Sequence, residues 1–264
     1  HLTTIRNIIG SSENYDLSYL TAQNLNSPFP PGTGFGTTTL LQGVSVHNYI
    51  NFSLSHTMLY AASGSGELTQ VNLPYGASLR WAYQSFTFNG TRTLREVANR
   101  YLTKAAGATE TNYAFAHDPA DSGRTIHALT TLNDPGGVGQ KAWFFNTTGT
   151  WQMGLASSLE ERTLPSQAVL RKLDYTWVQD AALKPYIGTV LTTLDPGTGN
   201  QKQAKTEQTL DLYGNVTQTK VYDYGSLVTP ARTYTNTYLA DSNYISRYIR
   251  DRLTLSTVTN GSET

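Results

Sequence analysis

The sequence predicts an all-β fold of short antiparallel strands. Strand-forming and turn-forming residues dominate the 264 residues, with 17 Tyr and 22 Gly against only 14% charged residues. Turn signals separate short alternating runs at a spacing of about 8–12 residues. A turn-plus-strand unit at residues 210–219 is echoed at residues 66–71, with Gly, Thr and Gln in the same register. A recurring unit of this kind is typical of β-repeat proteins, which usually build a surface or wall rather than one catalytic pocket.

The unit at residues 210–219 reads as a strand end, a tight turn and a new strand. Asp211, Gly214 and Asn215 would supply the turn, because Asp and Asn bond nearby backbone and Gly accepts positive φ. If Gly214 is in a left-handed conformation, a Gly214→Val substitution should hinder folding.

A second hairpin is predicted over residues 66–88. Pro74 pre-sets the first torsion of its turn, and Gly76 relieves the left-handed position. On the returning strand Trp81 and Tyr83 share one face, because side chains alternate along a strand.

The remaining elements follow the same logic. Residues 25–36 are rich in Pro and Gly and predict an irregular loop. Residues 94–102 fit both helical and strand spacing, and the β surroundings favour a strand. A short helical turn is expected over 244–249. Further strands are expected at 38–46, 48–54, 56–62, 111–116, 125–132, 140–146, 203–211, 215–223 and 231–239. No linker divides the chain, so residues 1–264 are interpreted as one continuous β-repeat region, a piece of a longer chain.

Composition excludes several classes of function. The formal net charge is zero, which gives no electrostatic reason to capture nucleic acid or an anionic membrane. The absence of Cys excludes disulfides and thiolate metal sites. No apolar run of about 18 residues exists, so membrane insertion is not expected. We expect neither a cofactor nor a metal.

Two clusters of ionisable residues are candidates for catalytic or metal sites. His117, Asp118 and Asp121 fit a polar turn better than a metal or acid–base site. Glu160 and Glu161, beside Arg162, lack a partner carboxylate at a readable spacing, so an exposed charge cluster is favoured over glycoside cleavage. The protein is therefore not expected to be an enzyme.

Aromatic residues alternate on two strands. Trp81 with Tyr83, and Tyr175 with Trp177, would each present two rings on one face. Core packing is the favoured role. The alternative is that these four rings stack against sugars in a carbohydrate-binding or cell-adhesion module.

Three segments resemble the rearrangement-hotspot (Rhs) or tyrosine–aspartate (YD) repeat family. They are Asp211-x-x-Gly214-Asn215-Val216-Thr217, then Val221-Tyr222-Asp223-Tyr224-Gly225, and residues 66–76 with the strand Trp81-x-Tyr83. The C-terminal stretch 235–249 is similar to segments found between such repeats. The repeats are degenerate, since Leu210-Asp211 stands where the family has Tyr-Asp.

The resemblance implies a spiralling antiparallel β-sheet ribbon of YD/Rhs-type hairpins that forms part of a shell or β-wall. It also implies a structural segment of a secreted or cell-surface protein whose assembly encloses a toxin or effector. The expected partners are further repeat segments of the same chain or other copies, an enclosed effector, or a surface glycan.

Overall fold

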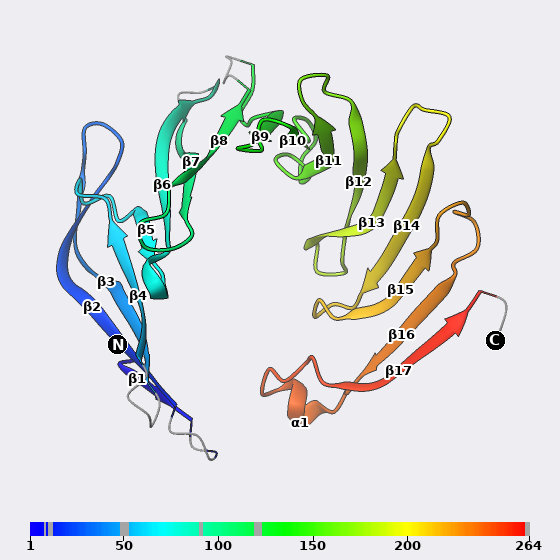
Figure 1. The fold of residues 1–264 in the computed structure, drawn as a ribbon. Coiled ribbons are helices and arrows are strands. Elements are labelled where there is room, and N and C mark those ends of the chain that lie inside the picture. Colours follow the sequence, from blue (N-terminus) through cyan, green and yellow to red (C-terminus); the bar gives the residue numbers. More distant parts are fainter. Residues whose placement is uncertain (8, 10–12, 48–52, 90–91, 119–122, 262–264) are drawn as a thin grey trace. The chain divides into compact units, whose positions relative to one another are not determined.

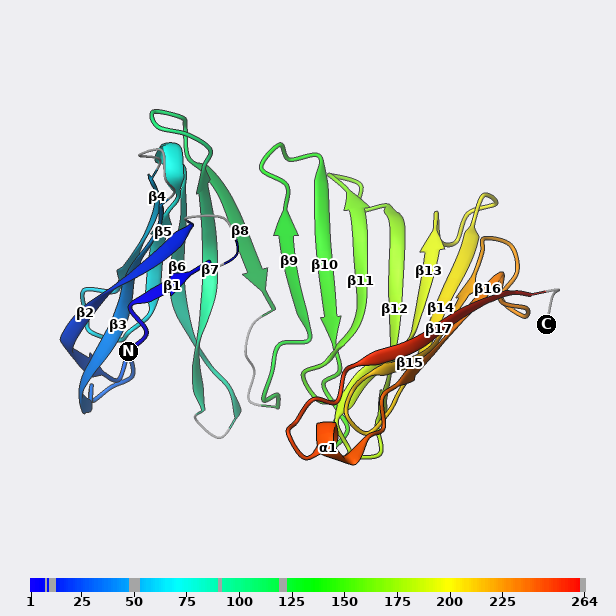
Figure 2. The same ribbon diagram turned by 90° about the horizontal axis from the view of Figure 1, so that it is seen from below.

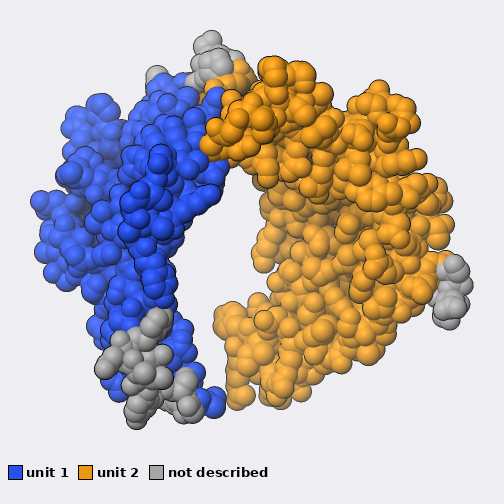
Figure 3. Space-filling model, in the orientation of Figure 1, with its two compact units in different colours: residues 1–116, 120–123 blue, residues 117–119, 124–264 orange. Residues whose placement is uncertain are grey.

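The structure is a computed structural model that describes residues 1–7, 9, 13–47, 53–89, 92–118 and 123–261. The chain divides into two compact units, residues 1–116 with 120–123 and residues 117–119 with 124–264 (Figure 3). Each unit is described by itself. The interpretation of residues 1–264 as one continuous repeat region stays a prediction.

The first unit is an antiparallel meander in which each strand pairs with its neighbour in sequence (Figure 1). Its strands are β1 (Thr4–Arg6), β2 (Asn14–Asn26), β3 (Gly34–His47), β4 (Ser53–Tyr60), β5 (Leu68–Asn72), β6 (Ser78–Thr87), β7 (Thr93–Thr103) and β8 (Thr111–His117), whose last residue is assigned to the second unit. A single 3₁₀ turn, Pro74–Gly76, joins β5 to β6. Strand β7 confirms the prediction of a strand over 94–102.

The second unit continues the same pattern, and Figure 2 shows its strands side by side. Its strands are β9 (Leu129–Asn133), β10 (Gly139–Phe145), β11 (Ala156–Thr163), β12 (Val169–Gln179), β13 (Pro185–Leu194), β14 (Lys202–Leu210), β15 (Val216–Tyr222), β16 (Arg232–Tyr238) and β17 (Leu253–Asn260). Each pairs antiparallel with the next. The short helix α1 (Ser242–Ile245) lies between β16 and β17.

The all-β antiparallel prediction is confirmed. Several bounds differ from it; the strand expected at 125–132, for example, begins only at Leu129. The Pro/Gly-rich segment 25–36 is not wholly irregular, because β2 runs to Asn26 and β3 begins at Gly34. The helical turn expected over 244–249 begins earlier, at Ser242, because Asp241 caps it by accepting a hydrogen bond from the Asn243 amide.

Neither unit has a large buried core among its described residues. The buried apolar residues are Phe88, Ala142 and Tyr222, and most strand positions are half-buried. Aromatic side chains instead bond to backbone on the preceding strand: Tyr60 Oη donates to Leu41 O at 2.7 Å, and Tyr83 Oη donates to Leu68 O at 2.8 Å. Stability along each sheet therefore comes from cross-strand contacts more than from a second packed layer.

Helices contribute little to either unit. Within the described part of the chain, no helix is long and apolar enough to cross a membrane.

Candidate functional site

The turn at Asp211 is closed by the side chain of its first residue. Asp211 Oδ1 accepts hydrogen bonds from the amides of Tyr213 at 2.8 Å and Asn215 at 2.9 Å. The Asp211 amide donates to Asn215 O at 2.9 Å, and Gly214 has φ of +89°. Burial would raise the pKa of Asp211, but hydrogen bonds from Asn215, Tyr213 and Gly214 outweigh it and hold the pKa below its ordinary value. The turn is thus built from local bonds that the sequence motif supplies.

The same turn recurs between β12 and β13 without the glycine. Asp180 Oδ1 accepts from the amides of Ala182 at 2.8 Å and Lys184 at 2.9 Å, and the Asp180 amide donates to Lys184 O at 3.0 Å. Leu183 stands where Gly214 stands in the other turn and has φ of +60°. The sequence motif missed this copy because Leu, not Gly, occupies the left-handed position. The available signal was an Asp directly after the strand that carries Tyr175 and Trp177.

The two Asp turns lie at the same end of the second sheet. In an antiparallel meander, alternate connections share an end, so the β12–β13 and β14–β15 turns are neighbours in one row. The row is tied to the β16–β17 connection, because Asn215 Nδ2 donates to Arg250 O at 2.7 Å. The Arg250 guanidinium also lies 4.8 Å from the ring centre of Tyr213.

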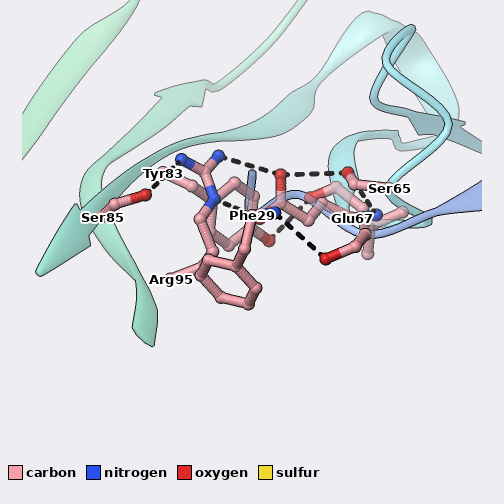
Figure 4. A network of polar contacts seen from close by, with 8 residues as sticks. Phe29, Ser65, Glu67, Tyr83, Ser85 and Arg95 are labelled. Carbon is pink, nitrogen blue, oxygen red and sulfur yellow. Dashed lines mark hydrogen bonds and ion pairs between the residues drawn. The ribbon is translucent and has the colours of Figure 1, made fainter. Parts of the chain in front are cut away.

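In the similar segment at residues 66–71, Glu67 follows Gly66 as Asn215 follows Gly214. Glu67 forms an ion pair. Arg95 on β7 donates to Glu67 through Nε at 2.8 Å and Nη2 at 3.0 Å, and Ser65 Oγ donates to Glu67 Oε2 at 3.1 Å (Figure 4). Hydrogen bonds from Arg95 lower the pKa of Glu67, and burial opposes them. Gly66, like Gly214, has positive φ, at +74°. In both segments the residue after the turn glycine, Glu67 or Asn215, therefore forms a hydrogen bond with a neighbouring part of the chain.

The Pro74–Gly76 turn places two residues in the left-handed region. Tyr75 has φ of +65° and Gly76 has φ of +77°. A Cβ added to Gly76 would lie 2.6 Å from the Ala106 Cβ. Gly76 is thus required both by its backbone conformation and by the close approach of the β7–β8 loop.

The aromatic pair of the first unit, Trp81 and Tyr83, makes contacts between neighbouring strands of the sheet. Trp81 is opposite Arg100 on β7, and Tyr83 is opposite Val97 after a bulge. The Tyr83 hydroxyl bonds to Leu68 O, and burial raises its pKa. Neither ring lines either of the two cavities described below.

The aromatic pair of the second unit lines a cavity of about 400 Å³. Its lining residues on β12 are Tyr175, Thr176 and Trp177. The remaining lining residues come from the β10–β11 loop and are Asn146, Thr148, Gly149 and Gln152. Burial raises the pKa of Tyr175. The structure therefore brings two of the four predicted stacking residues to a hollow with uncharged polar groups.

Backbone bonds close the β10–β11 loop at its base. The Asn146 amide donates to Leu155 O at 2.9 Å, and the Gly154 amide donates to Asn146 O at 2.9 Å. The indole of Trp177 donates to Ala156 O at 2.7 Å, which ties β12 to the end of the loop. The cavity wall is thus anchored on both sides.

A β-bulge sits directly beside Trp177. Thr176 is opposite Thr189 and Trp177 is opposite Ile187, so Gly188 is the additional residue on β13. A Cβ at Gly188 would lie 2.7 Å from Val178 Cγ2. The carbonyl of Ile187 accepts a hydrogen bond from Gln208 Nε2 at 2.8 Å. A bulge bends the strand that carries it, here β13, next to the position of Trp177 on β12.

A second cavity, of about 480 Å³, lies in the first unit over β2, β3 and β4. Its polar lining includes Gln23, Asn24, Asn26, Gln42 and Tyr60. Tyr60 is its single aromatic residue among the described lining residues, and the hydroxyl of Tyr60 is used by Leu41 O. It lacks the paired rings of the other cavity.

The acidic clusters weighed in the sequence are held in ion pairs. Glu160 accepts two bonds from Arg162, and these side chains are only 14% and 15% exposed, so the expected exposed cluster is wrong for this pair. The reason is β11 itself, which places residues 160 and 162 on one face. Glu161 faces Lys141 at 3.6 Å and Arg171 at 3.8 Å.

The His117 cluster forms part of a polar connection. His117 Nδ1 lies 2.9 Å from Thr130 Oγ1, and Asp118 pairs with Arg124 and accepts from the Leu129 amide at 3.1 Å. Asp121 lies outside the described residues.

The comparisons with known proteins give little that is specific. No protein-family model matches the chain, and no curated protein matches it. The crystal structure of TcdB2-TccC3-TEV is similar at 11% identity and a TM-score of 0.40. The match covers 89% of this chain and 16% of that chain.

Proposed function

We propose that this chain is a structural segment of a secreted or cell-surface protein of the Rhs/YD-repeat kind. Its β-sheets would form part of the wall of a shell or extracellular assembly that encloses a toxin or effector. The observation that supports a scaffold role is the way each unit is built. Strands add one after another, and turns, Tyr hydroxyls and ion pairs connect neighbours along the sheet with little buried core.

The last described strand supports continuation of the sheet by pairing. All eight residues of β17 are exposed, and its described ladder bonds are to β16. Leu253, Leu255 and Val258 are each more than half exposed. The strand carries no charged residue and no proline, two of the features that normally protect an edge.

The proposed partner of β17 is another strand of the same repeat type. Such a strand would come from a further segment of the chain or from another copy. The Thr and Val residues of β17 are of the same types as those of the internal strand β15, where they are half-buried. An added strand would cover this edge as β16 covers the other side of β17.

A catalytic role is not part of the proposal. The carboxylates of Glu160 and Glu161 face Arg and Lys side chains that neutralise them, which favours a structural use. No cofactor or metal is invoked.

The test combines electron microscopy of the native particles with association measurements on this chain. We expect closed shells or walls in the particles, and concentration-dependent association of the chain by analytical ultracentrifugation. Val258→Lys on β17 should suppress association. Leu170→Lys, at an exposed position on the internal strand β12, is the matched control and should not. A chain that stays monomeric at all concentrations, with isolated globular particles, would overturn the proposal.

A further inference from the structure

We propose that the cavity between β12 and the β10–β11 loop binds a neutral carbohydrate. This goes beyond the scaffold role, which needs no ligand. The occupant is a pyranose unit of an uncharged glycan, held against Tyr175 and Trp177.

The cavity combines the two chemistries that recognise a sugar ring. The lining residues of β12 include the two aromatic rings of Tyr175 and Trp177, which would supply apolar area for the C–H face of a pyranose. The lining residues of the loop include Asn146 and Gln152, which carry amide groups, and Thr148, which carries a hydroxyl. Each of these groups both donates and accepts hydrogen bonds, as sugar hydroxyls require. The volume of about 400 Å³ falls within the range of small-ligand sites.

The uncharged lining favours uncharged sugars over charged ones. The seven described lining residues are all uncharged. A carboxylate or phosphate would be desolvated there without a cationic partner, which is costly. The cavity therefore favours a neutral glycan over a sialylated, uronic or phosphorylated one.

The site is held in place before any ligand arrives. The loop is closed at Asn146 and Leu155, and the Trp177 indole is fixed by Ala156 O. A Cβ on Gly149, at φ of +95°, would lie 3.0 Å from Gln152 Oε1. The Gln152 amide thus packs over a glycine, and an anchored wall lowers the ordering cost of binding.

The experiment is calorimetric titration of the chain with cellotriose, maltotriose, triacetylchitotriose and sialyllactose. We expect at least one neutral trisaccharide to bind with a Kd of about 1 mM or tighter. Sialyllactose should bind at least tenfold more weakly, because its sialic acid is charged. Gln152→Ala and Trp177→Phe should each weaken the neutral sugar about tenfold or more.

Two variants serve as controls. Gln23→Ala alters the cavity of the first unit, and Trp81→Phe alters the other aromatic strand. Neither should change affinity. Because Trp177→Phe also removes the bond to Ala156 O, thermal unfolding is measured for it, and Gln152→Ala carries the test if it is unstable.

Three results would overturn the site. They are no binding by any neutral trisaccharide, loss of binding in Gln23→Ala but not in Gln152→Ala, and equal affinity for sialyllactose. None of these results bears on association through β17, so the scaffold proposal would stand or fall separately.

Discussion

Arg95 donates two hydrogen bonds, of 2.8 and 3.0 Å, to the carboxylate of Glu67. These bonds connect β7 to the segment that precedes β5. The two side chains are 27% and 16% exposed. Ser85 on the intervening strand β6 accepts from Arg95 Nη1 at 3.3 Å. A bidentate, part-buried pair therefore bridges across the strand between its partners, and its geometry is the strong form of an ion pair.

Glu67→Gln should destabilise the first unit by about 1 kcal/mol, because it removes the charge from a part-buried bidentate pair. The measurement is the midpoint of urea unfolding. Glu110→Gln is the matched control: Arg80 binds Glu110 with the same two-bond geometry, but both side chains are more exposed. We expect the control to change stability by less than about 0.5 kcal/mol. Equal losses in both variants would contradict the role assigned to burial.

The Glu67 pair should also give the protein an acid-sensitive stability. The pKa of Glu67 is lowered in the folded chain from an ordinary value of 4.5, mainly by bonds from Arg95. Its contribution is thus fully present above the unfolded pKa and is lost as pH falls through the folded pKa. Unfolding free energy, measured as pH is lowered from about 5, should fall less steeply in Glu67→Gln than in the unmodified chain. Parallel curves would argue against the linkage.

Substitutions at the equivalent positions of the two Asp turns, Leu183 and Gly214, should change stability in opposite directions. Leu183→Gly should stabilise the second unit by about 0.5–1 kcal/mol, because a left-handed Leu is strained and Gly is not. Gly214→Val should destabilise it by about 2 kcal/mol or more, because a β-branched residue is poorly accommodated at φ of +89°. Thermal unfolding measures both. A shift of the same sign in the two variants would show that the turns are not equivalent.

Gly76→Ala should cost more than the same change at Gly197. Both glycines have φ of +77°, so both substitutions carry the same backbone strain. The Gly76 Cβ would meet Ala106 at 2.6 Å, whereas nothing lies within 4 Å of a Cβ at Gly197. We expect Gly197→Ala to cost about 1 kcal/mol and Gly76→Ala at least about 1 kcal/mol more in urea unfolding. Similar losses would mean that the β7–β8 loop gives way at no cost.

The features that depend on short segments of the chain are the ones that the sequence predicts. The antiparallel strands, the strand over 94–102 and the Asp211 turn depend on alternation and on bonds within a few residues. The Asp180 turn uses the same bonds but was missed, because its left-handed residue is Leu183. Residue type is a weaker guide than the bonding pattern wherever a strained conformation is tolerated.

The aromatic pairs show what the sequence alone determined and what only the tertiary structure decided. Alternation on β6 and β12 sufficed to predict that Trp81 with Tyr83, and Tyr175 with Trp177, share a face. Both pairs lie beside a bulge of the next strand, and their different surroundings come from the β10–β11 loop, whose residues line a cavity together with Tyr175 and Trp177. The Glu67–Arg95 pair likewise joins residues 28 apart in sequence. Local alternation and turn chemistry act within a strand or turn, whereas these contacts depend on the register of strands that only the folded sheet sets.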